Sequence, residues 1–513
     1  MAVMKQIATP VGLYTQEPNT ATSLTGASSH TGDEWCDINW RKAHQNVRRL
    51  QARIVKATQE GRWGKVKALQ RLLTRSFSGK ALAVKRVTEN QGKRTPGVDG
   101  KTWSTPASKM AGLKSLRQHG YQAQPLRRLY IPKSNGKKRP LGIPTMKDRA
   151  MQALYKLALS PVAETKADRN SYGFREGRSC ADAIQAAFNA LSKPNSASFI
   201  LEADIDGCFD NISQSWLLKN ILMDKTILCK WLESGYIEND IKYPTLKGTP
   251  QGGIISPLLS NMTLDGLEEH IKSTVPRRKR VNFVRYADDF IVTGKSITIL
   301  EQDIKPAIEK FLSERGLSLS EEKTSITYIR DSFTFLGQTF RKHGNTLLIT
   351  PAKEGLQALL RKVGNLIRNY ISKPTEALIK KLNPVLRGWA NYHRHIVSSK
   401  AFNRVDTYVF EQLWRMVKRR HQNKTKGWLF KKYWSAAGKH LFSITHKYKE
   451  KTRILKVFRV SSLGIKRHIK IKADANPYLP EFGYYFWKRK NVKGANLLDG
   501  LSHRQYQVKM AMG

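Results

Sequence analysis

Two adjacent aspartates between two apolar runs limit what this chain can fold into more than any other feature of its sequence. Tyr286-Ala287-Asp288-Asp289 follows the run Val281–Val284 and precedes the run Phe290–Val292. Apolar runs on both sides of a short polar segment predict a strand, a tight turn and a second strand. Neighbouring carboxylates repel each other unless a cation lies between them, so this turn predicts a cation site. The alternative is an exposed acidic turn, which the flanking strands and the basic composition disfavour.

A second acidic segment offers the third carboxylate that a site with two metal ions needs. The predicted strand 198–205 carries Asp204 near its end, and Asp206 and Asp210 follow shortly after it. All three are alternatives by charge alone. The position at the end of a strand favours Asp204, and Asp210 is expected to cap the helix that follows.

The charge of the chain points to a polyanionic partner. Its 513 residues include 90 Lys and Arg against 40 Asp and Glu, a net charge of +50. Residues 351–513 alone carry 36 Lys and Arg against 8 Asp and Glu, a net charge of +28. Nucleic acid is the expected partner of such a surface, and its binding is expected to weaken steeply as salt rises. The alternative is a merely solvated surface, but lysine that serves solubility is normally balanced by glutamate.

Length and composition exclude several other classes of protein. A chain of 513 residues exceeds one core, and its 40% hydrophobic content is enough for folded domains. No run approaches the ~20 apolar residues of a membrane span, so no membrane partner is expected. The cysteines form no CxxC pair, which excludes a disulfide scaffold and a cysteine-rich zinc module and predicts a reducing compartment. They are Cys36, Cys180, Cys208 and Cys229.

Patterning divides the chain into five parts. Residues 1–35 are rich in Ser, Thr, Gly and Ala and are expected to form a flexible leader. Residues 36–112 are helical and basic, 113–341 mix helices and strands, 351–421 are helical, and 422–513 combine bases and aromatics without a clear period. Strands are expected at 127–132, 198–205, 282–287, 290–293 and 325–329, and helices include 374–382 and 402–420.

Together these segments resemble the reverse transcriptases that group II introns encode, the intron maturases. Asp204 with Phe209 and the Tyr286–Asp289 tetrapeptide are similar to the family's palm motifs, and Arg387–His393 is similar to its maturase-specific thumb. Further matches, in the family's order, are Thr95–Gly100, Gly136–Pro144, Ser171–Arg175 and Thr249–Gly253. The resemblance covers about residues 36–490.

The resemblance implies a right-hand polymerase of the α/β plus all-α class. Residues 113–341 would form the fingers and palm with an antiparallel sheet, and 351–421 the helical thumb, or X domain. Residues 36–112 would be a helical N-terminal extension, and 422–513 a basic DNA-binding region. Many family members also carry an HNH endonuclease with CxxC pairs, which is not expected here because the last cysteine is Cys229. Whether that domain is naturally absent or was truncated stays open.

Residue by residue, the resemblance implies a metal site and a nucleotide site. Asp204, Asp288, Asp289 and the carbonyl of Ile205 would hold two Mg²⁺ ions on the primer 3′-hydroxyl and the incoming triphosphate. The nucleotide itself would contact Lys133, Arg139, Phe209, Gln251 and Lys323. Lysine and arginine suit triphosphate capture as a point charge and a bidentate fork. The ring of Phe209 would exclude a 2′-hydroxyl, and Lys323 would protonate pyrophosphate.

Basic helices are expected to bind the phosphate backbone. On the N-terminal extension these residues are Arg48, Arg49 and Arg53, and on the thumb they are Arg387, Arg394, Arg415 and Arg419. The implied partners are intron RNA, target DNA, and an RNA template with a DNA primer and dNTPs. The expected location is the bacterial cytoplasm near the nucleoid, with an organelle as the alternative.

The implied function is RNA-directed DNA synthesis on intron RNA at a primed target, with help to the splicing of that RNA. Two alternatives remain at this point. One is a maturase that only assists splicing, which the intact aspartates disfavour. The other is a reverse transcriptase from a defence or CRISPR-linked system, which the maturase-like thumb disfavours.

Overall fold

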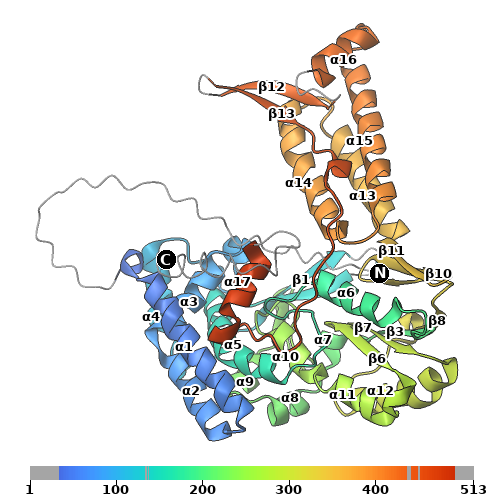
Figure 1. The fold of residues 1–513 in the computed structure, drawn as a ribbon. Coiled ribbons are helices and arrows are strands. Elements are labelled where there is room, and N and C mark those ends of the chain that lie inside the picture. The colour runs from blue at the N-terminus through green and yellow to red at the C-terminus, as the bar shows by residue number, and fades with distance from the viewer. Residues whose placement is uncertain (1–33, 133–135, 137, 436–440, 449–450, 492–513) are drawn as a thin grey trace, which may run out of the picture.

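The computed structural model describes residues 34–132, 136, 138–435, 441–448 and 451–491. The leader predicted over 1–35 lies almost entirely outside these residues, and so does Lys133. Figure 1 shows a broad body, in which N-terminal helices flank a mixed α/β region, and a helical thumb that rises from it. This arrangement confirms the predicted α/β plus all-α class.

The palm is a four-stranded antiparallel sheet in the order β6-β7-β3-β8. Its strands are β3 (Phe199–Asp204), β6 (Asn282–Tyr286), β7 (Asp289–Gly294) and β8 (Ser325–Tyr328). All four lie within a residue or two of their predicted positions, because buried β-branched and aromatic residues dominate them. The register sets Asp204 directly opposite Asp289.

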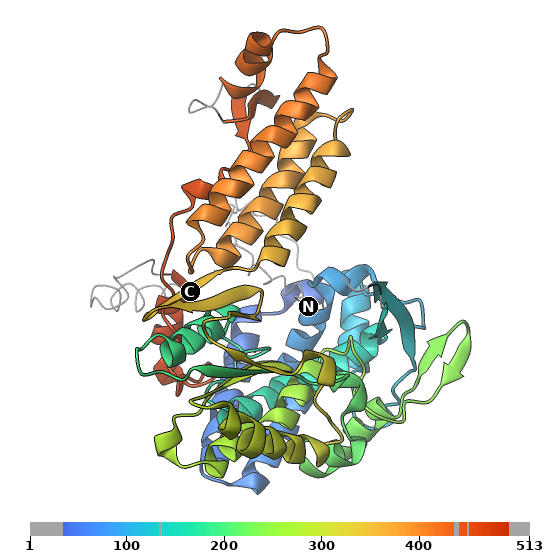
Figure 2. The same ribbon diagram turned by 90° about the vertical axis from the view of Figure 1, so that its right-hand side faces the viewer.

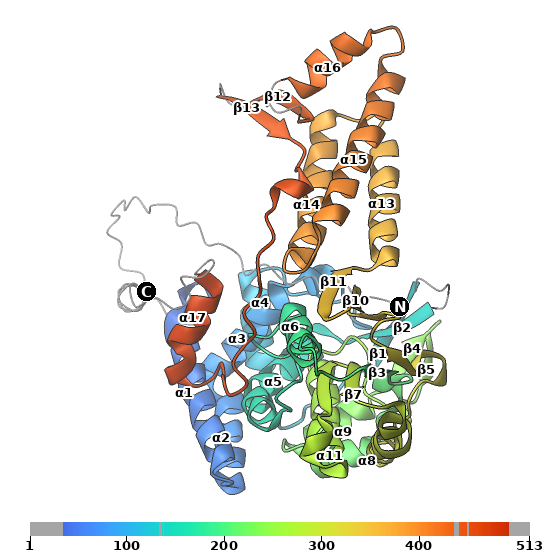
Figure 3. The same ribbon diagram turned by 45° about the vertical axis from the view of Figure 1, so that its right-hand side comes forward.

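A second four-stranded sheet, in the order β2-β1-β4-β5, forms the fingers. Its strands are β1 (Leu126–Pro132), β2 (Lys138–Ile143), β4 (Tyr236–Glu238) and β5 (Ile241–Tyr243). In Figure 2 the two hairpins of this sheet, teal and light green, project at the right, and Figure 3 labels their strands. The hairpin β1–β2 confirms the strand predicted at 127–132.

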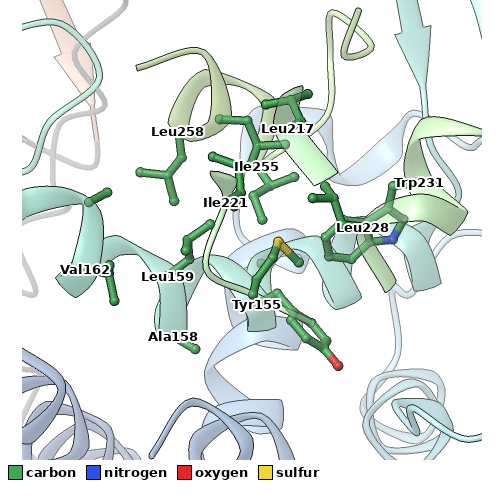
Figure 4. Close-up of a cluster of buried hydrophobic side chains, with 14 of the residues drawn as sticks. Tyr155, Ala158, Leu159, Val162, Leu217, Ile221, Leu228, Trp231, Ile255 and Leu258 are labelled. Atoms are coloured by element: carbon green, nitrogen blue, oxygen red, sulfur yellow. The ribbon is translucent and has the colours of Figure 1, made fainter. Parts of the chain in front are cut away.

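The core of the body lies under the central helix α5 (Met146–Lys166), which runs through Pro161. Figure 4 shows its apolar side chains meeting Leu217, Trp231 and Leu258 from three other helices. Those helices are α8 (Gln214–Asn220), α9 (Lys225–Leu232) and α10 (Ser256–Leu264). The same core continues into the N-terminal helices α1 (Trp40–Gln59), α2 (Trp63–Arg75) and α3 (Phe77–Thr88). The N-terminal extension is therefore packed on the body as part of one core.

The remaining elements complete the body and its junction with the thumb. They are the helices α4 (Pro106–Ser115), α6 (Cys180–Leu191), α11 (Leu267–Thr274) and α12 (Lys305–Ser313) and the strands β9 (Phe333–Phe335), β10 (Gln338–His343) and β11 (Thr346–Pro351). No helix of the part described here is both long and apolar enough to span a membrane.

The thumb is built on α13 (Lys353–Arg368), α14 (Thr375–His393) and α15 (Ser399–Arg420). The helix predicted at 374–382 is too short, since α14 continues through Pro384 to the end of the thumb motif. The thumb has its own apolar core, which extends past the predicted boundary at 421 into α16 (Lys426–Trp434) and the hairpin β12 (Ser443–Tyr448) and β13 (Lys451–Lys456). The aromatic residues after 421 show no regular spacing because they come from a helix, two strands and the segments between them that share one core.

Residues 464–491 leave the thumb and return to the body (Figures 1 and 3), where Tyr478 and Leu479 pack against Val55 of α1 and are followed by α17 (Gly483–Asn491). The buried carboxylate of Asp182, on α6, accepts hydrogen bonds from the Ile471 amide (2.7 Å), His468 Nε2 (2.9 Å) and Arg489 Nη2 (2.9 Å). Burial alone would raise the pKa of Asp182, but these partners bring it down to about 2. This part of the predicted DNA-binding region is thus tied to the palm.

Candidate active site

The Tyr286–Asp289 turn joins β6 and β7 and is held in an unusual conformation. Ala287 has φ 61°, in the left-handed region that residues other than glycine rarely adopt. Gly173 packs so closely beneath the turn that a Cβ at this position would lie 2.3 Å from the Ala287 amide nitrogen. Backbone strain of this kind persists only where the surroundings fix it.

A buried arginine supplies that support. The guanidinium of Arg285 donates to the Ala287 carbonyl (3.3 Å) and to Asp265 Oδ1 (2.5 Å), and lies 3.8 Å from Asp168 Oδ2. Burial raises the pKa of Asp265 to about 6, against the opposing charge of Arg285. The backbone of Arg285 also forms hydrogen bonds with Asn170 and Tyr172, so the strand that leads into the turn is fixed as well.

Three carboxylates meet at this turn. Asp204, at the end of β3, lies opposite Asp289 across the sheet, and Asp288 sits at the tip of the turn. Burial, followed by the charges of Asp204, Asp288 and Glu202, raises the pKa of Asp289 to about 8. Burial and Asp204 raise the pKa of Asp288 as well. Such mutual repulsion is expected of carboxylates that share one site, and a divalent cation between them would relieve it.

The donor set suits a hard divalent cation. Mg²⁺ prefers carboxylate and carbonyl oxygens, and the residues here offer no sulfur or imidazole ligand. As the side chains stand, no group of three or more His, Cys, Asp or Glu residues in the described part of the chain could hold a metal ion. The Asp204 carboxylate instead forms an ion pair with the ammonium of Lys323. Chemically the site fits Mg²⁺, with Lys323 providing the positive charge in this structure.

The other two acidic alternatives are on the surface. Asp206 and Asp210 are exposed, and the Asp206 amide bonds to Ser318 O (3.0 Å). The prediction that Asp210 caps the next helix is wrong. Asp210 lies inside the short helix α7 (Cys208–Asn211), and Ser213 caps α8 by accepting a hydrogen bond from the Trp216 amide. The chain leaves α7 at Ile212, which moves the cap position beyond Asp210.

Backbone hydrogen bonds hold Phe209 and Gln251, two of the residues predicted to contact nucleotide. Phe209 is buried and packs edge-on against Phe174, with ring centroids 6.5 Å apart. Its carbonyl accepts a hydrogen bond from the Thr249 amide (2.7 Å), and Gln251 O accepts one from the Gly142 amide (2.7 Å). The segment Thr249–Gly253 therefore links the fingers strand β2 to Phe209.

Arg139, Ile205 and Lys323 complete the set of described residues. Arg139 lies on β2 and its positive charge acts on the Asp288 carboxylate, so the fingers strand faces the site. Ile205 is buried and bridges to Leu319, which brings the segment of Lys323 next to Asp204. Lys133 lies outside the described residues, so its placement stays a prediction.

Sequence reasoning missed a contact between the thumb and the turn that joins β9 to β10. The hydroxyl of Tyr392, on α14, donates to Leu336 O (2.8 Å) in the turn between β9 and β10. The thiol of Cys180 forms hydrogen bonds with both Tyr286 and Tyr392. Leu336 and Gly337 both have positive φ (50° and 71°), and a Leu-Gly pair between two aromatic strands was the one sequence signal for this turn.

The predicted nucleic-acid contacts differ in whether their guanidinium groups bind distant parts of the chain. Arg49, Arg53, Arg387, Arg415 and Arg419 are exposed, although Arg415 lies 4.0 Å from Glu411. The Arg48 guanidinium instead donates to Glu176 Oε1 (3.0 Å) and to Pro477 O (3.1 Å), and Arg394 Nη2 donates to Gly464 O (3.4 Å). Arg48 and Arg394 therefore hold the C-terminal segment in place.

Comparison with known proteins decides the family. Residues 131–340 match the reverse transcriptase (RNA-dependent DNA polymerase) model, 35–116 the N-terminal domain of reverse transcriptase, and 356–434 the group II intron maturase-specific domain. The chain is 31% identical to Protein YkfC of Escherichia coli over 53% of its own length and 82% of that protein. The chain belongs to the group II intron-encoded reverse transcriptases. Its domains make it an RNA-directed DNA polymerase with a maturase module.

Other matches to this reverse transcriptase are partial. It is 31% identical to the group II intron-encoded protein LtrA of Lactococcus lactis, over 55% of this chain and 58% of LtrA. The chain thus spans little more than half the length of that relative. A solved telomerase structure from Candida albicans aligns with 60% of this chain and 63% of its own at 14% identity, with a TM-score of 0.34.

Proposed function

We propose that this reverse transcriptase copies group II intron RNA into DNA at a primed target and binds the same RNA to assist its splicing. The observation that carries the proposal is the meeting of Asp204, Asp288 and Asp289 at one turn, with Phe209 and Arg139 beside them. Burial, followed by repulsion from the neighbouring carboxylates, raises the pKa of Asp289, and a bound cation would relieve that repulsion.

Reverse transcriptases use divalent metal ions, and we propose two Mg²⁺ here. Asp204, Asp288, Asp289 and the carbonyl of Ile205 would hold them. When bound, the ions supply Lewis-acid activation of the primer hydroxyl and neutralise charge on the triphosphate. For Asp204 to take part, the ammonium of Lys323 would have to leave it. Lys323 would then be the proton donor to departing pyrophosphate.

The remaining residues would bind and select the nucleotide. The Arg139 guanidinium offers a bidentate fork for phosphate, and Lys133 a second positive charge. Phe209 would pack against the sugar and leave no room for a 2′-hydroxyl, which favours dNTPs over ribonucleotides. Gln251 would contact the sugar or base edge, since its backbone is fixed against β2.

Intron RNA and target DNA are the proposed macromolecular partners. The exposed arginines of α1 and of the thumb would contact the phosphate backbone, and the net charge of +50 favours that contact. We propose the extension over 36–112, the fingers and palm over 113–341, and the basic DNA-binding region within 422–513. The thumb begins at 351, and its core continues past residue 421. A cytoplasmic site of action near the bacterial nucleoid is likewise proposed.

Two other functions find less support. A maturase that only assists splicing would have no use for Asp204, Asp288 and Asp289 at one turn, where burial and mutual repulsion disfavour their charged forms. A defence-linked reverse transcriptase would not need the maturase-specific domain that matches at 356–434.

Primer extension tests the proposal directly. The protein is incubated with a DNA primer annealed to RNA, with dNTPs and with Mg²⁺, Ca²⁺ or no divalent cation. We expect RNA-templated extension with Mg²⁺ alone, and tight binding of an intron RNA fragment. Binding of that RNA without extension would instead favour the maturase that only assists splicing.

A further inference from the structure

A cavity of about 410 Å³ lies in the thumb, away from the catalytic turn. It is bounded by α14 and by the segment that follows β13 and ends in the short helix η6 (Val460–Ser462). Its polar and aromatic lining comprises three bases, one aromatic ring and two hydroxyls: Arg387, Lys456, Arg459, Phe458, Ser461 and Ser462. The lining contains no carboxylate, so the cavity is strongly cationic.

The cations of this cavity are oriented but not neutralised. The Arg387 guanidinium lies 5.1 Å from the centroid of the Phe458 ring, and Arg459 Nε donates to Ser461 Oγ (3.2 Å). Within the described part of the chain, no ion pair joins Arg387, Lys456 or Arg459 to an acidic side chain. Positive charges gathered without acidic partners favour an anionic ligand.

The backbone that carries the hydroxyls is fixed. Both oxygens of the Asp406 carboxylate, on α15, accept hydrogen bonds from η6, one from the Val460 amide (2.7 Å) and one from the Ser461 amide (2.8 Å). Asn383 on α14 bonds the same segment, accepting from the Phe458 amide (2.8 Å) and donating to Lys456 O (2.9 Å). A pocket with a fixed backbone loses little conformational entropy when a ligand binds.

We propose that this cavity binds one unpaired nucleotide of an RNA strand. The three cations would hold its phosphates, the ring of Phe458 would stack on its base, and the serine hydroxyls would bond the ribose 2′-hydroxyl. The volume falls within the roughly 300–1,000 Å³ of small-ligand pockets, which suits a single nucleotide better than a duplex. Hydroxyls that can donate and accept suit the 2′-hydroxyl that distinguishes RNA from DNA. This inference rests on the proposed binding of intron RNA and names one site for it.

Photocrosslinking tests the site on the full chain. The probe is an unstructured 12-nucleotide oligouridine that contains 4-thiouridine, and its matched control is the deoxy oligonucleotide with 4-thiothymidine. We expect the RNA to crosslink to Phe458 or a neighbouring residue of the cavity, located by mass spectrometry of the peptides. The dissociation constant for the RNA should rise about tenfold in Arg459→Gln, because a charge-assisted hydrogen bond is lost. If the Phe458 ring stacks on a base, the dissociation constant for the RNA should rise about fivefold in Phe458→Leu.

A charge-matched control separates this site from general attraction. Lys381→Gln removes one exposed charge from α14, the helix that bounds the cavity, but Lys381 itself lies outside the cavity, so this change should weaken binding far less than Arg459→Gln. Arg459→Lys, which keeps the charge, should bind better than Arg459→Gln and shows that the chain still folds. Equal losses in Lys381→Gln and Arg459→Gln, equal binding of the DNA probe, or crosslinks confined to other residues would each overturn the proposal. Wild-type protein that binds no RNA at all would refute the proposed RNA binding itself.

Discussion

The hydroxyl of Tyr392 in the thumb lies 2.8 Å from the carbonyl oxygen of Leu336 at the edge of the palm, and donates a hydrogen bond to it. Through Cys180, the same hydroxyl is linked to Tyr286 of the catalytic turn. One side chain of the thumb therefore contacts the β9–β10 turn directly and the catalytic turn through Cys180. We infer that Tyr392 is a positioning residue, which fixes the thumb relative to the carboxylates.

Replacing Tyr392 with phenylalanine should affect primer handling more than stability. The loss of one hydrogen bond costs about 1 kcal/mol in unfolding free energy. We expect Tyr392→Phe to raise the KM for primer-template several-fold while kcat changes little, as measured by steady-state extension. Tyr408→Phe, a matched change on α15 of the thumb, should leave both constants unchanged. The same KM in both variants would show that Tyr392 serves only packing.

Removing the guanidinium of Arg285 should destabilise the palm severely. In Arg285→Met, Asp265 and Asp168 would remain buried without their partner, and breaking a buried ion pair costs about 3–5 kcal/mol. We expect a marked fall in the thermal unfolding temperature, whereas Arg277→Met at an exposed site should change it little. A fall of similar size in both variants would contradict the role given to Arg285.

Acidification should destabilise the junction of thumb and palm. Burial, followed by the nearby His395, lowers the pKa of His393 to about 3, and burial with His468 lowers that of His395 to about 4. Below pH 6.5 the unfolded chain takes up protons that the folded chain does not. Stability is therefore present above pH 6.5 and lost as pH falls toward 4, by about 2 kcal/mol per histidine at pH 5.

Thermal unfolding between pH 5 and pH 7.5 measures this effect. His393→Gln should flatten the pH dependence of the unfolding temperature, and His119→Gln, at an exposed position, should leave it as in the wild type. An equal pH dependence in all three proteins would show that the buried histidines do not contribute.

Discrimination against ribonucleotides should depend on Phe209. Phe209→Leu shortens the side chain proposed to exclude the 2′-hydroxyl, and we expect the ratio of dNTP to NTP incorporation to fall about tenfold or more. Phe174→Leu changes the ring that packs against Phe209 and serves as the matched control. The measurement is single-nucleotide extension with each substrate, and an unchanged ratio in Phe209→Leu would contradict the assignment.

Local patterns allowed the palm to be predicted closely. The strands around Asp204 and Asp289 alternate or run apolar, and two strands joined by a short turn can meet in few registers. The family resemblance then named the residues around them. Both signals lie within short segments, which is why they were readable from the sequence.

Contacts across long stretches of chain could not be predicted in this way. Asp182 binds His468 and Arg489, and Arg48 binds Glu176, through side chains that no local period connects. The sequence around Arg48 on the basic face of α1 does not distinguish it from Arg49 and Arg53, although Arg48 alone of the three binds Glu176 and Pro477. The cap of α8 was missed because one turn of helix intervenes before Ser213.

The most direct test of the central claim compares Asp289→Asn with Asp206→Asn in single-turnover extension of a DNA primer on RNA. Asp289 faces Asp204 at the site, whereas Asp206 is exposed nearby and has the same chemistry. We predict that Asp289→Asn lowers the extension rate by about a hundredfold or more while RNA binding is retained, and that Asp206→Asn extends like the wild type. Normal extension by Asp289→Asn, or an equal loss in Asp206→Asn, would contradict the account.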